Sequence, residues 1–214
     1  MRLSIVLTFF LLFNTVPIQA KLLVILDAGH GGEDTGALRK FGKKIIAEKD
    51  LTLALARQTS TALKKYGIDV VLTRTRDIYI GLDKRTELAN AAAANGRTAV
   101  FISIHANSSP DARSNGVETY IFNATNNDAS RRLADLENGK RWAQSHGTLE
   151  LILSDLATTA NYGASLQLAC LVQDSVLNQL KHQGQNKLRN RGIRQALFYV
   201  LMQTHMPSLL FEPG

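Results

Sequence analysis

Short apolar runs and stretches of helical period alternate along this chain. Residues 22–26 are continuously apolar, as in a strand buried on both faces of a sheet, and they lead into the glycine-rich segment 27–34. From Glu48 to Tyr66 the apolar residues recur at helical spacing, and Gly67 then ends the pattern. A strand, a loop and a helix in this order are typical of α/β domains.

The same alternation continues beyond Gly67. Further strands are expected at 70–73, 99–104 and 116–122, and helices at 82–94 and 163–183. Residues 123–162 are rich in Asn, Asp, Arg and Ser and predict one or two short helices. A basic turn is expected at 187–194, before short apolar runs at 197–202 and 209–211. No internal repeat or low-complexity linker divides the chain, so one α/β domain is the simplest interpretation.

The first twenty residues have the pattern of a secretory signal peptide, which would leave 21–214 as the mature domain. Arg2 precedes an apolar run at 3–13, and small Ala20 precedes Lys21. This run is shorter than the roughly twenty residues that a membrane-spanning helix needs. An uncleaved anchor is the alternative, and we expect no transmembrane segment after cleavage.

Composition removes several classes of protein. With 45% hydrophobic and 20% charged residues, the 214-residue chain is neither disordered nor collagen-like. Its one cysteine, Cys170, excludes an internal disulfide and a thiolate zinc site. The net charge of +7 suits an anionic partner such as a cell-wall polymer or a lipid surface, although solubility explains a basic chain equally well.

Four residues that could bind a metal or take part in catalysis follow predicted strands or open a predicted helix. His30 and His105 follow strands, Glu48 opens a helix, and Glu212 follows the last apolar run. Two imidazoles and a carboxylate are the ligand set of a catalytic zinc that keeps one position open for water. Each residue also has a structural interpretation: Glu48, for example, would be favoured by the helix dipole alone. Periodicity does not show whether the four converge, so both interpretations stay open.

Other catalytic signatures are missing from the sequence. It contains no Gly-x-Ser-x-Gly elbow and no phosphate-binding Walker loop. The basic cluster Lys187, Arg189, Arg191 and Arg194 has no interleaved aromatic residues, which disfavours nucleic-acid binding. We interpret it as a solvated turn or as a contact for an anionic substrate.

Seven short stretches gain meaning from their common order and spacing: 26–32, 48–50, 73–74, Arg85 with 89–90, 103–107, 116–118 and 207–214. On these stretches the chain resembles the zinc-dependent N-acetylmuramoyl-L-alanine amidases of the third amidase type, the cell-wall hydrolases of bacterial division. The resemblance covers nearly the whole mature chain. It implies a single α/β domain with a mixed, mostly parallel twisted sheet of about six strands and helices on both faces.

The resemblance also implies a set of roles. One zinc ion per chain would be held by His30, Glu48 and His105, and Glu212 would be the catalytic base. The substrate would be peptidoglycan, cut at the amide between N-acetylmuramic acid and L-alanine of the stem peptide. Zinc would lower the pKa of a bound water to about 7, and Glu212 would take its proton and pass it to the leaving amine. Asn107 and Arg194 are the expected substrate contacts.

Two departures from the family pattern bear on activity. Relatives continue past the last glutamate, whereas this sequence stops at Gly214. We therefore expect fraying of the chain end to displace Glu212. Segment 123–162 is shorter than the inhibitory insertions of some division amidases. We therefore favour loss of such regulation over an inhibitory contact from Glu137 or Glu150.

The leading hypothesis is an exported, monomeric zinc amidase of the periplasm or cell envelope. A zinc peptidase that cuts within the stem peptide would use the same ligands. A non-catalytic or activator-dependent wall-binding module would keep the fold. A binder of anions or nucleic acid would instead lose its affinity in salt and need no metal.

Overall fold

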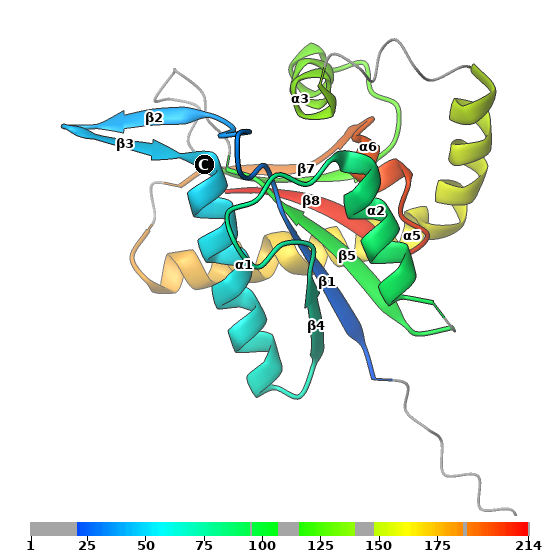
Figure 1. The fold of residues 1–214 in the computed structure, drawn as a ribbon, viewed down its shortest axis with the longest axis horizontal. Coiled ribbons are helices and arrows are strands. Elements are labelled where there is room, and N and C mark those ends of the chain that lie inside the picture. The colour runs from blue at the N-terminus through cyan, green and yellow to red at the C-terminus, as the bar shows by residue number, and fades with distance from the viewer. Residues whose placement is uncertain (1–20, 95, 107–115, 140–147, 186–187, 214) are drawn as a thin grey trace, which may run out of the picture.

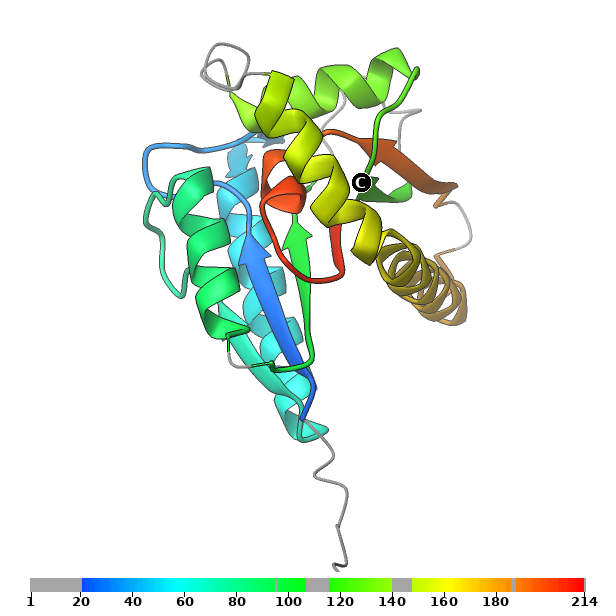
Figure 2. The same ribbon diagram turned by 90° about the vertical axis from the view of Figure 1, so that its right-hand side faces the viewer.

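The computed structural model describes residues 21–94, 96–106, 116–139, 148–185 and 188–213. The predicted signal peptide, residues 1–20, lies outside these ranges. A six-stranded sheet in the order β4-β1-β5-β8-β6-β7 runs through the described domain, with helices on both faces (Figures 1 and 2). Its strands are β1 (Leu23–Ala28), β4 (Asp69–Leu72), β5 (Ala99–Ile104), β6 (Val117–Phe122), β7 (Asn190–Ala196) and β8 (Ser208–Pro213).

The sheet is parallel except where β6 pairs with β8. Because β1 and β5 are parallel neighbours, their carboxyl ends meet at one edge of the sheet, where ligands of α/β domains usually bind. Residues that follow these two strands are therefore brought together. This edge is the one that the sequence predicts to be functional.

Alternating side chains of β1 pack against opposite helical layers. Leu23 and Ile25 belong to the core cluster that includes residues of α2 and α3, whereas Val24 and Leu26 pack in the cluster that includes Ala56 of α1. A strand with both faces covered has to be apolar throughout, which explains its continuous hydrophobic run. The helices are α1 (Glu48–Lys65), α2 (Leu82–Ala92), α3 (Asp128–Asn138), α5 (Thr148–His182) and α6 (Tyr199–Met202).

The predicted single-domain α/β class, with a mostly parallel sheet and helices on both faces, is confirmed. Two element assignments are wrong. The helix expected at 163–183 begins at Thr148, and the expected basic turn at 187–194 contains most of β7. A strand carrying Arg191 and Arg194 is possible there because both guanidinium groups pair with buried Glu118 of β6. The basic residues of this segment gave no indication of an edge strand, because their partner lies on another strand.

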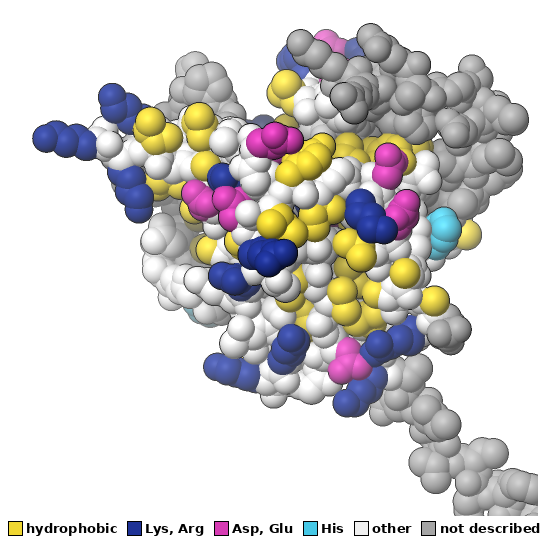
Figure 3. Space-filling model, in the orientation of Figure 1, with side chains coloured by type: hydrophobic (Ala, Val, Ile, Leu, Met, Phe, Trp, Pro, Cys, Tyr) yellow, Lys and Arg dark blue, Asp and Glu magenta, His cyan; other side chains and the backbone are white. Residues whose placement is uncertain are grey.

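A hairpin of β2 (Leu38–Phe41) and β3 (Lys44–Ala47) was not expected from the sequence. It forms a sheet of its own and projects from the domain (Figure 1). Leu38 and Ile45 are exposed on it, so these two strands lack the pattern of buried apolar residues from which a strand is predicted. In Figure 3 the cations form several separate groups over the visible face, one of them at this hairpin.

Within the described part of the chain, no helix combines the length and the apolar character needed to cross a membrane.

Candidate metal centre

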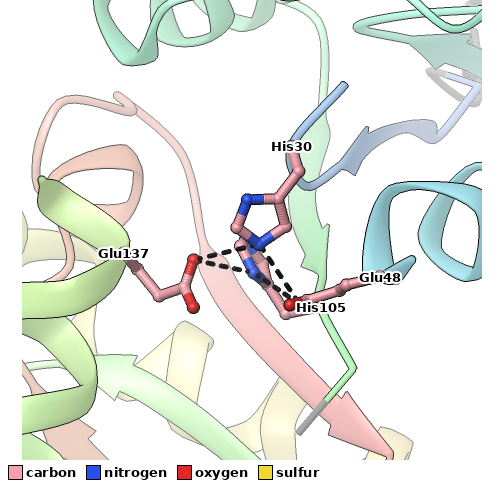
Figure 4. A group of neighbouring side chains, drawn as sticks. All are labelled: His30, Glu48, His105 and Glu137. Atoms are coloured by element: carbon pink, nitrogen blue, oxygen red, sulfur yellow. Dashed lines mark ion pairs between the residues drawn. The ribbon is translucent and has the colours of Figure 1, made fainter. Parts of the chain in front are cut away.

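Four side chains meet at the carboxyl edge of β1 and β5: His30, Glu48, His105 and Glu137 (Figure 4). His30 and His105 follow the two strands, Glu48 is the first residue of α1, and Glu137 lies in the last turn of α3. One ligand atom from each residue can be chosen so that all lie within 4.8 Å of one another. Three of the four are the residues that the sequence singles out as zinc ligands.

The two histidines face the carboxylates with different ring nitrogens. Nε2 of His30 lies 3.2 Å from Oε1 of Glu48 and 3.4 Å from Oε2 of Glu137. Nδ1 of His105 lies 3.3 Å and 3.0 Å from the same two oxygens. Both nitrogens are buried and make no hydrogen bond within the described residues. Buried polar atoms normally have a partner, so this donor set fits a metal ion.

The tautomer of His30 is set by Asp34. Nδ1 of His30 is 3.0 Å from Oδ2 and 3.1 Å from Oδ1 of Asp34. Because a carboxylate only accepts, Nδ1 carries the proton and Nε2 presents its lone pair to the centre. A carboxylate behind a ligating histidine is a common orienting device in metal sites.

Backbone amides hold both oxygens of Glu48. Ala106 N–H donates to Oε1 (2.9 Å), and Ala37 N–H donates to Oε2 (3.0 Å). Burial alone would raise the pKa of Glu48, but the close contacts and charges of His105 and His30 lower it well below its usual range. Glu48 is therefore a fixed carboxylate anion. Its position at the start of α1 adds the favourable field of the helix dipole.

The histidines experience the reciprocal effect. Burial opposes protonation of His105, but the charges and close contacts of Glu137 and Glu48 raise its pKa well above 6.5. The pKa of His30 is also raised, because Glu48 outweighs burial and the charge of His105. The negative charges of Glu48 and Glu137 thus favour a positive charge between them. A metal cation held by these residues would supply that charge in place of the protons.

Glu212 follows Phe211, whose carbonyl accepts from the His105 N–H (3.0 Å), and it lies in β8 directly opposite Glu118 of β6. It is 1% exposed, and its Oε2 has no hydrogen-bond partner in the described residues. Burial raises the pKa of Glu212 well above 4.5, the charge of His105 opposes this, and the charges of Glu137, Glu48 and Glu118 add to it. The expected fraying is wrong, because Glu212 pairs with Glu118 of β6 and the preceding Phe211 pairs with Ile104 of β5. Its carboxyl is suited to accept and release a proton.

A cavity of about 460 Å³ adjoins the centre. Its lining includes His30, Asp34, His105 and Glu137, together with Tyr79 from the loop between β4 and α2. The two histidines and Glu137 therefore face space in which a substrate group can lie.

The two expected substrate contacts have different outcomes. Asn107 lies outside the described residues. Arg194 lies on β7, and its Nε is 2.9 Å from Oε2 of Glu118, the residue opposite Glu212. Arg194 is thus near the predicted base through Glu118, and its contact with substrate stays a prediction.

Glu137 is the residue that sequence reasoning did not place in the ligand set. Its helix, α3, lies in the polar segment 123–162, and an acidic residue in a polar helix carries no local signal of ligation. The position of Glu137 in the centre is compatible with the inhibitory contact that the sequence disfavours. The side chain of Glu150 lies outside the described part of α5.

Comparison with known proteins agrees with the geometry. The family model described as N-acetylmuramoyl-L-alanine amidase matches residues 24–214. The amidase AmiA of Escherichia coli K12 is 35% identical over 202 residues, which is 90% of this chain and 65% of that protein. This chain therefore spans less than two thirds of that relative's length.

Two solved structures have the same fold. The amidase AmiC2 of Nostoc punctiforme aligns with a TM-score of 0.59 and 30% identity, over 89% of this chain and 77% of that one. An N-acetylmuramoyl-L-alanine amidase from Clostridium difficile 630 aligns with a TM-score of 0.61 and 29% identity, over 90% and 78%. The likeness thus extends over about nine tenths of the chain.

Proposed function

Since this chain belongs to the N-acetylmuramoyl-L-alanine amidase family, we propose that it hydrolyses the amide between N-acetylmuramic acid and L-alanine of the peptidoglycan stem peptide. The observation that carries the proposal is the pair of buried nitrogens, His30 Nε2 and His105 Nδ1, which face Glu48 and make no hydrogen bond within the described residues. A site of this kind needs a cation, and buried Glu212 supplies a further carboxyl for acid–base chemistry.

One zinc ion is the cofactor that this donor set fits best, with His30, Glu48 and His105 as its ligands. Imidazole and carboxylate together suit zinc, and a catalytic site has three protein ligands. When bound, zinc supplies a Lewis acid for the scissile carbonyl and makes water more acidic at neutral pH. The remaining chemistry belongs to the protein.

Glu212 is the proposed general base and then the general acid. Its raised pKa brings a carboxyl, normally ionised at neutral pH, closer to the pH at which it can both take and give a proton. As base it accepts the proton of the attacking water, and as acid it returns that proton to the amine of L-alanine. The bond from the carbonyl carbon to that nitrogen breaks as the amine leaves.

Glu137 has to leave the centre before water and substrate can enter. With Glu137 included, the centre has four protein side chains, which is the number typical of closed structural zinc sites. An open position therefore requires that the carboxylate of Glu137 moves away, by rotation of its side chain or displacement of α3. This supports an activator-dependent enzyme more than a module that has lost its catalytic base, since Glu212 is in place.

The expected setting is the periplasm or cell envelope, with the chain acting as a monomer. The N-terminal pattern of residues 1–20 supports export, and the net charge of +7 supports adhesion to an anionic wall. Asn107 and Arg194 are the proposed substrate contacts. An activating protein is the proposed partner, and nucleic acid is not.

The decisive experiment is digestion of purified peptidoglycan by the mature chain with zinc, followed by mass spectrometry. Stem peptides with a free N-terminal L-alanine are the expected products. Products cut within the stem peptide would instead identify a zinc peptidase. The Glu212→Gln variant, assayed in parallel, controls for contaminating hydrolases.

The absence of products from both the wild-type chain and a Glu137→Ala variant would contradict the proposal. The second variant is needed because a closed centre would suppress activity in the wild-type chain alone. Binding to peptidoglycan without cleavage by either chain would then favour the wall-binding module.

A further inference from the structure

Two buried arginines lie behind the turn that carries His30. Arg74 follows β4 and is 2% exposed, and Arg85 belongs to α2 and is 3% exposed. Arginine is rarely buried this completely, because its desolvation costs free energy unless every donor finds an acceptor. The acceptors found here are therefore informative about what the two residues do.

Both side chains donate to the turn itself. The carbonyl of Ala28 accepts from Arg74 Nε (2.9 Å) and Arg85 Nη1 (2.7 Å). The carbonyl of Gly29 accepts from Arg74 Nη2 (2.8 Å), and that of His30 accepts from Arg85 Nη2 (2.7 Å). Three consecutive carbonyls are thus held by charged donors. Because a guanidinium is a rigid planar fork, it fixes the relative direction of the carbonyls that it binds.

Thr52 of α1 completes the arrangement. Its hydroxyl donates to the carbonyl of Gly29 (2.8 Å) and accepts from Arg74 Nη2 (3.1 Å). Thr52 is buried and lies one helical turn after Glu48. The same network therefore ties the turn of one proposed ligand to the helix that carries another.

The turn needs this support because its backbone is strained. His30 has φ +59°, in the left-handed region that non-glycine residues rarely adopt. The preceding Gly29 leaves no room for a side chain, since an added Cβ would lie 2.6 Å from Nε2 of His105. Such a conformation persists only where surrounding contacts determine it. In it, Nε2 of His30 is aimed at Glu48.

We propose that Arg74 and Arg85 are positioning residues that hold the His30 turn in its metal-binding conformation before any metal arrives. This inference rests on the proposed metal-dependent function. Arg85 also balances the charge of buried Asp27, whose Oδ1 lies 2.8 Å from Arg85 Nη1, but any positively charged side chain at this position could do that. Holding the carbonyls of Ala28 and His30 at once needs the fork, and lysine does not provide it.

Zinc affinity and amide exchange test this proposal without relying on catalysis. Arg85→Lys keeps the charge beside Asp27, and Thr52→Val keeps the shape of the side chain while removing the hydroxyl. We expect both variants to bind zinc about 10- to 100-fold more weakly in competition with a chromophoric chelator, the usual cost of losing support behind a ligand. In the metal-free proteins, hydrogen exchange at the amides of residues 29–32 should be faster than in the wild-type chain.

Matched controls come from the same chain. Arg97→Lys alters an exposed arginine that pairs with Asp69, and Thr61→Val removes an exposed hydroxyl of α1 that donates to the Arg57 carbonyl of the same helix. Neither change should alter zinc affinity. Cooperative thermal unfolding of each metal-free variant checks that it is folded. If Arg85→Lys does not fold, Thr52→Val decides the outcome.

Wild-type zinc affinity and amide exchange in the folded variants would overturn the proposal. A higher KM for Arg85→Lys with unchanged zinc affinity would also overturn it, because Arg85 would then act on substrate. The proposed function fails separately: a wild-type chain that binds zinc but releases no peptide with N-terminal alanine contradicts the amidase assignment and leaves this inference standing.

Discussion

Glu118 and Glu212 lie directly opposite each other in the register between β6 and β8, and both are 1% exposed. Oε2 of Glu118 lies 3.0 Å from Arg191 Nε and 2.9 Å from Arg194 Nε. Oε2 of Glu212 has no hydrogen-bond partner in the described residues. Two adjacent buried carboxyls therefore have different environments, which is a common way to separate an acid–base residue from a structural one.

The first prediction concerns the charge of Glu118. Its negative charge contributes to the raised pKa of Glu212, so Glu118→Gln should lower the pKa of Glu212. Because the base acts when ionised, the acidic limb of the pH–activity profile should move to lower pH. Glu87→Gln, at an exposed site of α2, is the control. An unmoved acidic limb would show that Glu118 does not tune the base.

The second prediction separates catalysis from metal binding at Glu212. Glu212→Gln should lower the turnover number by about 10²- to 10⁴-fold, the usual contribution of a general acid or base. Bound zinc, measured by inductively coupled plasma mass spectrometry, should stay at the wild-type ratio. A variant that loses zinc as well would make Glu212 a ligand.

The third prediction concerns the closed state of the centre. Contacts with charged groups contribute roughly 1.5–3 kcal/mol, so Glu137→Ala should raise kcat/KM by about 10- to 100-fold as the site opens. Asp135→Ala, at an exposed position of the same helix, should leave kcat/KM unchanged. Reduced activity in Glu137→Ala, with loss of zinc, would instead mean that Glu137 is a required ligand.

The fourth prediction concerns the carboxylate behind His30. Asp34→Asn replaces the acceptor of His30 Nδ1–H by a weaker one, and zinc affinity should fall by about 10- to 100-fold. Chelator competition at fixed pH measures this. The neighbouring exposed residue Glu33 gives a control, and equal affinities in Glu33→Gln and Asp34→Asn would contradict the orienting role.

The fifth prediction concerns stability at low pH. Burial would raise the pKa of Asp27, but the charge of Arg85 and hydrogen bonds from Thr73, Arg85 and Ser103 lower it below 3.8. A lowered folded-state pKa gives stability that is present above the unfolded pKa and is lost as pH falls through the folded value.

Asp27→Asn should therefore lower the free energy of unfolding by roughly 3–5 kcal/mol at pH 7, because it leaves Arg85 buried without its partner charge. The difference from the wild-type chain should shrink below about pH 4, near the unfolded pKa. Urea unfolding at several pH values tests both statements. Asp69→Asn, which breaks an exposed pair with Arg97, should cost less than about 1 kcal/mol.

The sequence by itself determined the fold class and most elements, because local patterns encode them. The buried strand β1 is apolar at nearly every position, and α1 begins at Glu48 as the periodicity predicts. Elements without a local apolar signal were not predicted. Hairpin β2–β3 exposes Leu38 and Ile45, and β7 carries cations whose partner, Glu118, lies on another strand.

His30, Glu48, His105 and Glu212 were identified from the sequence because they follow strands or open a helix and match a family pattern in order and spacing. Only the tertiary structure decided that the first three meet, which nitrogen of each histidine faces the carboxylates, and that Glu137 joins them. The same holds for the carbonyl contacts of Arg74 and Arg85. The physical reason is that ligand geometry depends on contacts between residues far apart in the chain, which hydrophobic periodicity does not encode.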